Sequence, residues 1–215
     1  AGNYSEDDAK KAAEAANKIL SDLGLETRVQ VYDSEKNGEF NADNLDETDN
    51  WAVIGTDRKA VGQKANEIDP EWDTSDWVKD SGQGRAKPED KKGIMWHDRN
   101  NKAIQHGKVS AKEWNGLGIS HESGHSSDYI RSEGVKYGKH GEDGKHFIFG
   151  IMADGTSSLN SYYRGQGESV KSKDNNKGFI RGMEERYGTN KAKDNYFKNK
   201  LRIANENKIP KCHLK

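Results

Sequence analysis

Cysteine and long apolar runs are almost absent from this sequence of 215 residues. Its one cysteine, Cys212, excludes a disulfide within the chain and a metal cage built from thiolates. No run of 18 apolar residues occurs, so we expect no insertion into a membrane. Any metal ion would therefore be held by histidine and carboxylate side chains.

An excess of charge of either sign is also missing. The 35 Lys and Arg residues and the 36 Asp and Glu residues leave a net charge of −1. Proteins that bind the phosphate backbone of nucleic acids normally carry a basic groove. The balanced charge therefore argues against nucleic acid as a partner.

Apolar residues make up 31% of the chain and the mean hydropathy is −1.15, which approaches the composition of disordered chains. Five Trp, eight Tyr and five Phe are nevertheless spread along the whole length, as in a folded chain. The length suffices for one substantial core, and neither an internal repeat nor a low-complexity linker marks a boundary. We predict one domain over residues 1–215, with a thin core and long polar loops.

Hydrophobic periodicity and turn residues predict a mixture of helices and strands. The clearest helix follows Ser5, an N-cap candidate, and stops near Gly24. A short helix over 61–72 should end at Pro70, and a loop is expected over 81–92. The remaining predictions are strands at 28–33, 51–57 and 93–104, an extended segment at 145–155, and late helices at 178–188 and 195–207.

A helix from Ser110 to about Ile130 would contain the word HESGH. Ser110 is its N-cap candidate, and Glu113 stands at the capping-box position. At about 100° per residue, His121 and His125 lie about 40° apart on the side that carries the apolar residues. Both histidines should therefore face inward.

Three glycines in this helix, Gly116, Gly118 and Gly124, are poor helix formers that each cost about 1 kcal/mol relative to alanine. Their presence in a helix with inward-facing histidines indicates a close neighbour. We expect another element to pack very near the helix backbone.

The pattern H-E-x-x-H lets two imidazoles share one zinc ion, and the Glu122 carboxylate between them can act as general base on a water bound to that zinc. The word would occur in about 2% of random sequences of this composition, so its helical setting has to support it. The alternative is a helix whose histidines only fill space. Asp128, about one turn further, should either accept a hydrogen bond from an imidazole N–H or be a solvated acid at the helix end.

The segment HESGHSSD, residues 121–128, resembles the signature of zincin metallopeptidases. Its H-E-x-G-H-x-x-D form is similar to the HExxH peptidase domains at the C-terminal tips of Rhs-type polymorphic toxins, and the order of predicted elements is similar as well. Ser123 departs from that pattern, because those domains usually carry an apolar residue there. The resemblance implies an α+β, zincin-like fold in which a small sheet packs on the active-site helix, with additional C-terminal helices.

A zinc hydrolase needs a third protein ligand and keeps the fourth position for water. The metzincin spacing fails, since Asp128 and Arg131 stand where that class has Gly and His. A gluzincin-like arrangement takes a Glu from a later helix, and Glu184 borders the apolar face of the helix at 178–188. We therefore predict a zinc ion held by His121, His125 and Glu184. The alternatives for the third ligand are Glu133, His140, His146, Asp154 and Glu185, and the candidates to stabilise an oxyanion are Tyr162, Tyr163, Tyr187 and His146.

The function predicted from these residues is that of a zinc-dependent endopeptidase acting on a protein or peptide, with Glu122 as general base. The toxin resemblance implies a secreted domain that is delivered into a target cell, belongs to a larger protein and is neutralised by an immunity protein. Two alternatives remain open. The first is a metal-dependent nuclease toxin domain that uses the same histidines, and the second is an inactive zincin-fold binding module.

Overall fold

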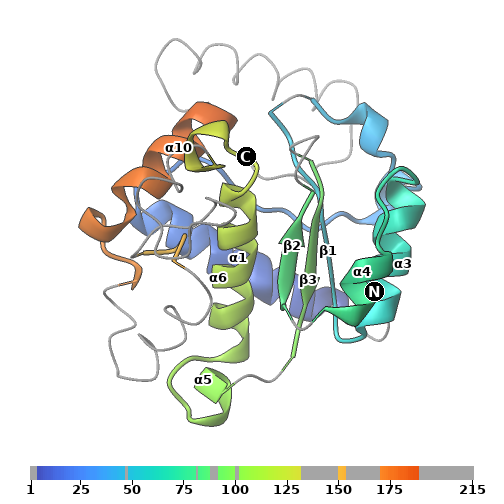
Figure 1. The fold of residues 1–215 in the computed structure, drawn as a ribbon, viewed down its shortest axis with the longest axis horizontal. Coiled ribbons are helices and arrows are strands. Elements are labelled where there is room, and N and C mark those ends of the chain that lie inside the picture. The colour runs from blue at the N-terminus through green and yellow to red at the C-terminus, as the bar shows by residue number, and fades with distance from the viewer. Residues whose placement is uncertain are drawn as a thin grey trace.

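A small sheet of three strands lies between helices in this computed structural model (Figure 1). The structure describes residues 4–46, 48–80, 82–87, 92–99, 102–131, 150–153 and 170–188. The helices are α1 (Glu6–Asp22), α2 (Ser34–Asn37), α3 (Arg58–Ile68), α4 (Ser75–Lys79), α5 (Lys102–Gln105), α6 (Ala111–Gly124) and α10 (Lys177–Tyr187), with 3-10 turns at Ala42–Asn44 and Asp174–Asn176. This mixture of helices and a small sheet agrees with the predicted α+β class. No helix of the described part is long and apolar enough to cross a membrane.

The sheet has the strand order β1-β3-β2, with β1 at Ala52–Gly55, β2 at Gly84–Ala86 and β3 at Ile94–His97. Strand β3 runs parallel to β1 and antiparallel to β2. The strands predicted within 51–57 and 93–104 are confirmed, whereas the loop predicted over 81–92 is wrong because β2 lies in it. Its three residues show no apolar alternation, and they become a strand only by pairing with β3.

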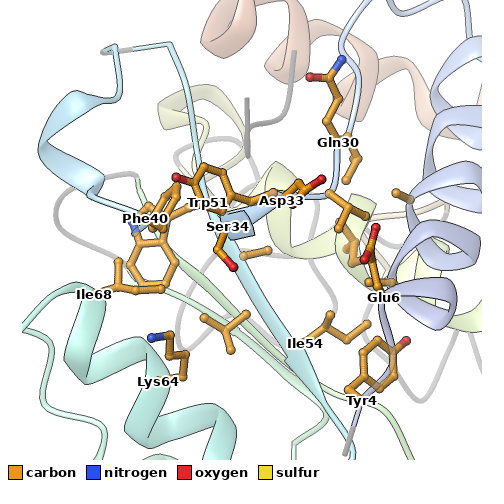
Figure 2. Close-up of a pocket in the computed structure, with 18 of the residues that line it drawn as sticks. Tyr4, Glu6, Gln30, Asp33, Ser34, Phe40, Trp51, Ile54, Lys64 and Ile68 are labelled. Carbon is orange, nitrogen blue, oxygen red and sulfur yellow. The ribbon is translucent and has the colours of Figure 1, made fainter. Parts of the chain in front are cut away.

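The strand predicted at 28–33 is also wrong, because the segment forms only an isolated bridge at Val29. The Asn17 side chain of α1 accepts a hydrogen bond from the Val29 N–H (2.6 Å) and donates one to the Val29 carbonyl (2.8 Å). These backbone groups are therefore bonded to a helix side chain. A cavity of about 500 Å³ is lined by residues 29–35 and by β1 (Figure 2).

Two apolar clusters occupy the two sides of the sheet. Helix α6 packs against one side, with α1 and α10 packed on α6, and α3 and α4 cover the other side (Figure 1). Strand β3 serves both clusters by alternation, since Ile94 and Trp96 belong to the first and Met95 to the second. Four buried tryptophans belong to these clusters: Trp51, Trp72, Trp77 and Trp96.

Helix α1 follows the prediction at both ends. The Ser5 side chain accepts a hydrogen bond from the Asp8 N–H at 3.0 Å, and Gly24 just beyond the helix has φ +85°. Its apolar stripe packs on α6, where a Cβ at Gly116 would fall 2.6 Å from the Ala16 nitrogen. This contact is the close neighbour that the α6 glycines predict.

Helix α6 begins as predicted, with a complete capping box between Ser110 and Glu113. It ends at Gly124, however, and not near Ile130. Tight turns follow, and the Ser127 hydroxyl accepts a hydrogen bond from the Ile130 N–H (3.3 Å) where residues 128–131 become helical again. A side-chain cap thus restarts the chain as a separate helical turn.

The predicted helix at 178–188 is confirmed as α10, which ends at Gly188 with φ +79°. The helix predicted to end at Pro70 is α3, whose C-cap is Asp69. Of the extended segment predicted at 145–155, the structure describes only 150–153, and the helix predicted at 195–207 lies outside the described residues.

Candidate functional site

His121 and His125 converge at the C-terminal end of α6. Their Nε2 atoms are 3.1 Å apart, and their rings stand at 78° to each other. Two imidazoles bound to one zinc at 2.0–2.1 Å in tetrahedral geometry have their nitrogens about 3.3 Å apart. The two side chains, both half-buried, therefore fit a shared metal ion.

The ring of His121 is oriented from its other nitrogen. Its Nδ1 lies 2.6 Å from the Ile151 carbonyl oxygen, so an Nδ1–H donates there and the Nε2 lone pair is left for a metal. The Ile151 N–H in turn donates to the side chain of Asn176 (2.7 Å), which is buried and donates to Val170 and Ser172 carbonyls. A chain of hydrogen bonds from residues 170–176 thus holds His121.

Glu122 is the most buried of the three motif residues, with 6% of its surface exposed. Its carboxyl lies against strand β2 and accepts a hydrogen bond from the Ala86 N–H. Burial raises the pKa of Glu122 to about 8, although the Ala86 N–H and the nearby charge of Arg85 lower it in part. A cation bound next to this carboxyl would favour its charged form.

A buried polar cluster fixes the chain on both sides of His125. The Asn50 side chain accepts from the Gly93 N–H (2.6 Å), and it donates to the Ser126 hydroxyl (2.7 Å) and the Tyr187 hydroxyl (3.2 Å). Tyr187 donates to the carbonyl of Ser123 at 3.2 Å. The end of α6 is therefore bonded to the turn before β3 and to α10.

Tyr187 and Ser123, which the sequence analysis singled out, both lie in or next to this cluster. Tyr187, a candidate to stabilise an oxyanion, is buried with its hydroxyl bonded to Asn50 and Ser123, which makes it part of the support of α6. Ser123, the departure from the family pattern, is fully buried and donates to the Ile119 carbonyl. A hydroxyl is accepted at this position because its own helix satisfies it.

Asp128 is mostly exposed and forms an ion pair with Arg131 at 2.7 Å. Of the two roles predicted for Asp128, its exposure fits the solvated acid, and at His121 the hydrogen bond from the imidazole goes to the Ile151 carbonyl. No sequence pattern could predict that the Ile151 carbonyl would bind His121, because the two residues lie 30 positions apart.

The structure does not bring Glu184 to the two histidines. The buried stripe of α10 is formed by Phe179, Met183 and Tyr187, and this stripe turns Glu184 and Glu185 outward into solvent. Within the described ranges no group of three His, Cys, Asp or Glu side chains gathers to hold a metal. Glu133, His140, His146, Asp154, Tyr162 and Tyr163 lie outside the described residues.

The cavity at the β1 edge lies apart from this motif. Figure 2 shows aromatic and aliphatic side chains in its lining, among them Phe40, Trp51 and Ile68, together with the acids Glu6 and Asp33. Helix α6 contributes Ile119 to the lining, but none of the three motif residues does.

Comparisons with models of protein families, with curated proteins and with solved structures find no match for this chain. The interpretation of the site therefore rests on the geometry of its own residues. Sequence reasoning predicted His121, Glu122 and His125 as site residues. It missed Ile151, Asn176 and Asn50, because side chains and carbonyls that act through tertiary contacts leave no local pattern.

Proposed function

We propose that this domain is a zinc-dependent endopeptidase with a zincin-like active-site helix. His121 and His125 would hold the metal, and Glu122 would act as general base. The observation that carries the proposal is the convergence of the two Nε2 atoms, 3.1 Å apart, on a helix whose intervening Glu122 is buried.

Zinc, when bound, supplies a Lewis acid for the scissile carbonyl and lowers the pKa of a water molecule. The chain supplies the remaining functions. His121 is fixed in one orientation by the Ile151 carbonyl. The chain around His125 is held by Asn50, which donates to the Ser126 hydroxyl, and by Tyr187, which donates to the Ser123 carbonyl. Glu122 takes a proton at its carboxylate and passes it to the leaving amine.

The edge of strand β2 supports a peptide as substrate. The His97 N–H bonds the Gln83 carbonyl and the Lys87 N–H bonds the Gly93 carbonyl, so the backbone groups of residues 84 and 86 between them point away from β3. Among the strands of the described part, β3 is the only neighbour of β2. The Ala86 N–H is bonded to Glu122, so an extended peptide beside Glu122 would form its main-chain hydrogen bonds with the Gly84 N–H and with the carbonyls of Gly84 and Ala86.

Glu184 and Glu185 face solvent, so the third zinc ligand stays a prediction among Glu133, His140, His146 and Asp154. Each can be changed to alanine in turn, and zinc affinity measured by competition with a chelator. The true ligand is the one whose loss weakens zinc binding as much as His121→Ala does. Equal affinity across the whole series would contradict a third protein ligand from this set.

The proposed activity is tested with zinc-loaded wild type and Glu122→Gln on a library of peptides, beside DNA and RNA. We expect wild type to cleave peptides, and Glu122→Gln to keep its zinc without cleaving. Cleavage of nucleic acid that depends on His121 would favour the nuclease. A zinc-loaded wild type that cleaves nothing would favour the inactive binding module.

We also infer from the resemblance of HESGHSSD that the domain is delivered into a target cell as part of a toxin and meets an immunity protein at home. Expression in a bacterial cytoplasm should then inhibit growth. His121→Ala and Glu122→Gln should both remove the inhibition at matched protein levels. If cells that express wild type grow as well as cells that express either variant, in several hosts, the toxin role is contradicted and the peptidase chemistry stays open.

A further inference from the structure

The carboxyl group of Glu122 lies against strand β2 at Gly84, where an added Cβ would collide with it. A Cβ added at Gly84 would fall 2.6 Å from Glu122 Cδ, even closer to Oε1, and 2.7 Å from Cε3 of Trp96. Real Cβ atoms essentially never approach other heavy atoms within 3.0 Å. Gly84 does not have a positive φ, so the position requires glycine for space and not for backbone conformation.

Strand β2 holds the same carboxyl by a hydrogen bond. The Ala86 backbone N–H points away from β3, toward the outer edge of the sheet, and donates to Glu122. The wall behind the carboxyl is Trp96 of β3, whose indole N–H donates to Asn115 of α6 at 2.9 Å. We call Gly84, Ala86 and Trp96 the Glu122 seat.

Helix α6 is also bound to Gln83, the residue just before β2, about two turns before Glu122. The Trp114 indole N–H donates to the Gln83 side chain at 2.9 Å, and the Gln83 amide donates to the His97 carbonyl at 3.2 Å. The helix therefore lies along the strand from Trp114 to Glu122, as Figure 1 shows for α6 and β2. The seat cannot move away from Glu122 without breaking this contact.

The two histidines are held by other parts of the molecule. His121 is bonded to Ile151, and the backbone around His125 is bonded through Ser126 to Asn50. A change at Gly84 should therefore move the carboxyl of Glu122 and leave both imidazoles in place.

We propose that Gly84 and the Ala86 N–H are positioning groups for the general base: they set where the Glu122 carboxylate lies relative to the metal held by His121 and His125. This inference rests on the proposed function. It predicts that a substitution at Gly84 lowers activity and leaves zinc binding unchanged. A displacement of about 1 Å at a catalytic group can lower a rate about 100-fold.

The test compares zinc-loaded Gly84→Ala with Gly82→Ala on a peptide that wild type cleaves. Gly82→Ala is the matched control, because the atoms nearest to a Cβ there belong to the Asp80 carboxyl, at 3.3 Å or more. We expect Gly84→Ala to bind one equivalent of zinc and to lose about 100-fold in kcat, with KM changed less than about threefold. Gly82→Ala should keep the wild-type kcat.

A double-mutant cycle identifies the cause of the loss. Asp is one methylene shorter than Glu, so Glu122→Asp should relieve the clash with the methyl group that Gly84→Ala adds. The thermal midpoint of the metal-free protein should then fall less with Gly84→Ala in the Glu122→Asp background than in wild type. An equal fall of the thermal midpoint in both backgrounds would overturn the Glu122 seat. Loss of zinc in Gly84→Ala, or a kcat of Gly84→Ala equal to that of wild type, would overturn it as well.

A wild type without zinc-dependent cleavage would overturn the proposed function and the catalytic role of the seat. The thermal midpoints would still show whether the Glu122 carboxyl lies against Gly84.

Discussion

Helices α1 and α6 pack against each other but are built on opposite principles. Helix α1 buries one stripe of alanine and aliphatic side chains and exposes acids and lysines that pair one turn apart, as Glu6 does with Lys10. Helix α6 is buried from Trp114 to Ser120 without interruption. In a helix that is buried on every side, the polar groups lose their hydrogen bonds to water, so they need hydrogen-bond partners within the protein.

The polar groups of α6 have such partners. The Asn115 side chain accepts from the Trp96 indole, and the hydroxyls of Ser120 and Ser123 donate to carbonyls one turn earlier in the helix. Glu122 accepts from strand β2. Helix α1 thus contributes stability through its apolar stripe, whereas α6 depends on many specific contacts and is therefore the more sensitive to substitution.

The largest loss of stability is expected where the end of α6 is bonded to the rest of the molecule. Asn50→Ala removes the partner of the Gly93 N–H, the Ser126 hydroxyl and the Tyr187 hydroxyl, all of them buried. We expect about 3 kcal/mol less free energy of unfolding, measured by urea denaturation of metal-free protein. The exposed Asn37→Ala is the control, with a change below about 0.5 kcal/mol. Equal losses in the two variants would contradict a supporting role for Asn50.

A second prediction reverses the usual sign of a helix substitution. Glycine to alanine inside a helix normally stabilises by about 1 kcal/mol. At Gly116 the new Cβ would meet backbone atoms of α1, at 2.6 Å from Ala16 N and 2.7 Å from Ala15 C, so we expect a loss of about 2 kcal/mol. Glu14→Gly on the exposed side of α1 should cost about 1 kcal/mol through propensity alone. A Gly116→Ala variant more stable than wild type would refute the close approach of the two helices.

Much of this fold could be predicted from local patterns. Capping residues and apolar periodicity located α1, α10 and the start of α6, and β-like runs located β1 and β3. Strand β2 and the segment at Val29 could not be found this way, because a pairing partner forms the first and Asn17 binds the backbone of the second. Both depend on contacts between residues distant in sequence.

The site divides in the same manner. The spacing of four residues on a helix predicted that His121 and His125 would meet, and their Nε2 atoms do so at 3.1 Å. The burial of Glu122 could not be predicted, because it depends on Gly84 in a strand that local patterns do not reveal. Glu184 was placed from the face of an isolated helix, and the packing of α10 turns it into solvent.

The third prediction concerns the dependence of stability on pH. In the folded metal-free protein the pKa of Glu122 is raised from 4.5 to about 8 by burial, so its contribution to stability is fully present below pH 4.5 and is lost as the pH rises through 8. Glu122→Gln cannot ionise and keeps an oxygen for the Ala86 N–H. Between pH 5 and pH 8 the thermal midpoint of wild type should therefore fall by several degrees more than that of Glu122→Gln. Parallel changes in the two proteins would show that the buried carboxyl does not titrate in this range.

The smallest effects belong to α1. Ser5→Ala removes its N-cap and should cost about 1 kcal/mol in free energy of unfolding. Lys10→Ala breaks only the exposed pair with Glu6, so we expect less than about 0.5 kcal/mol, and less still at 1 M salt. Urea titrations of both variants check the order, and a larger loss for Lys10→Ala would contradict it.

We propose that the C-terminal end of α6 carries a zinc site formed by His121 and His125, with Glu122 beside it as base and not as ligand. The most direct test is the zinc content of purified protein after zinc loading and dialysis, measured for wild type, His121→Ala, His125→Ala and Glu122→Gln. We predict about one equivalent in wild type and in Glu122→Gln, and a small fraction of one in both histidine variants. Wild type without stoichiometric zinc, or histidine variants that bind as much zinc as wild type, would contradict the claim.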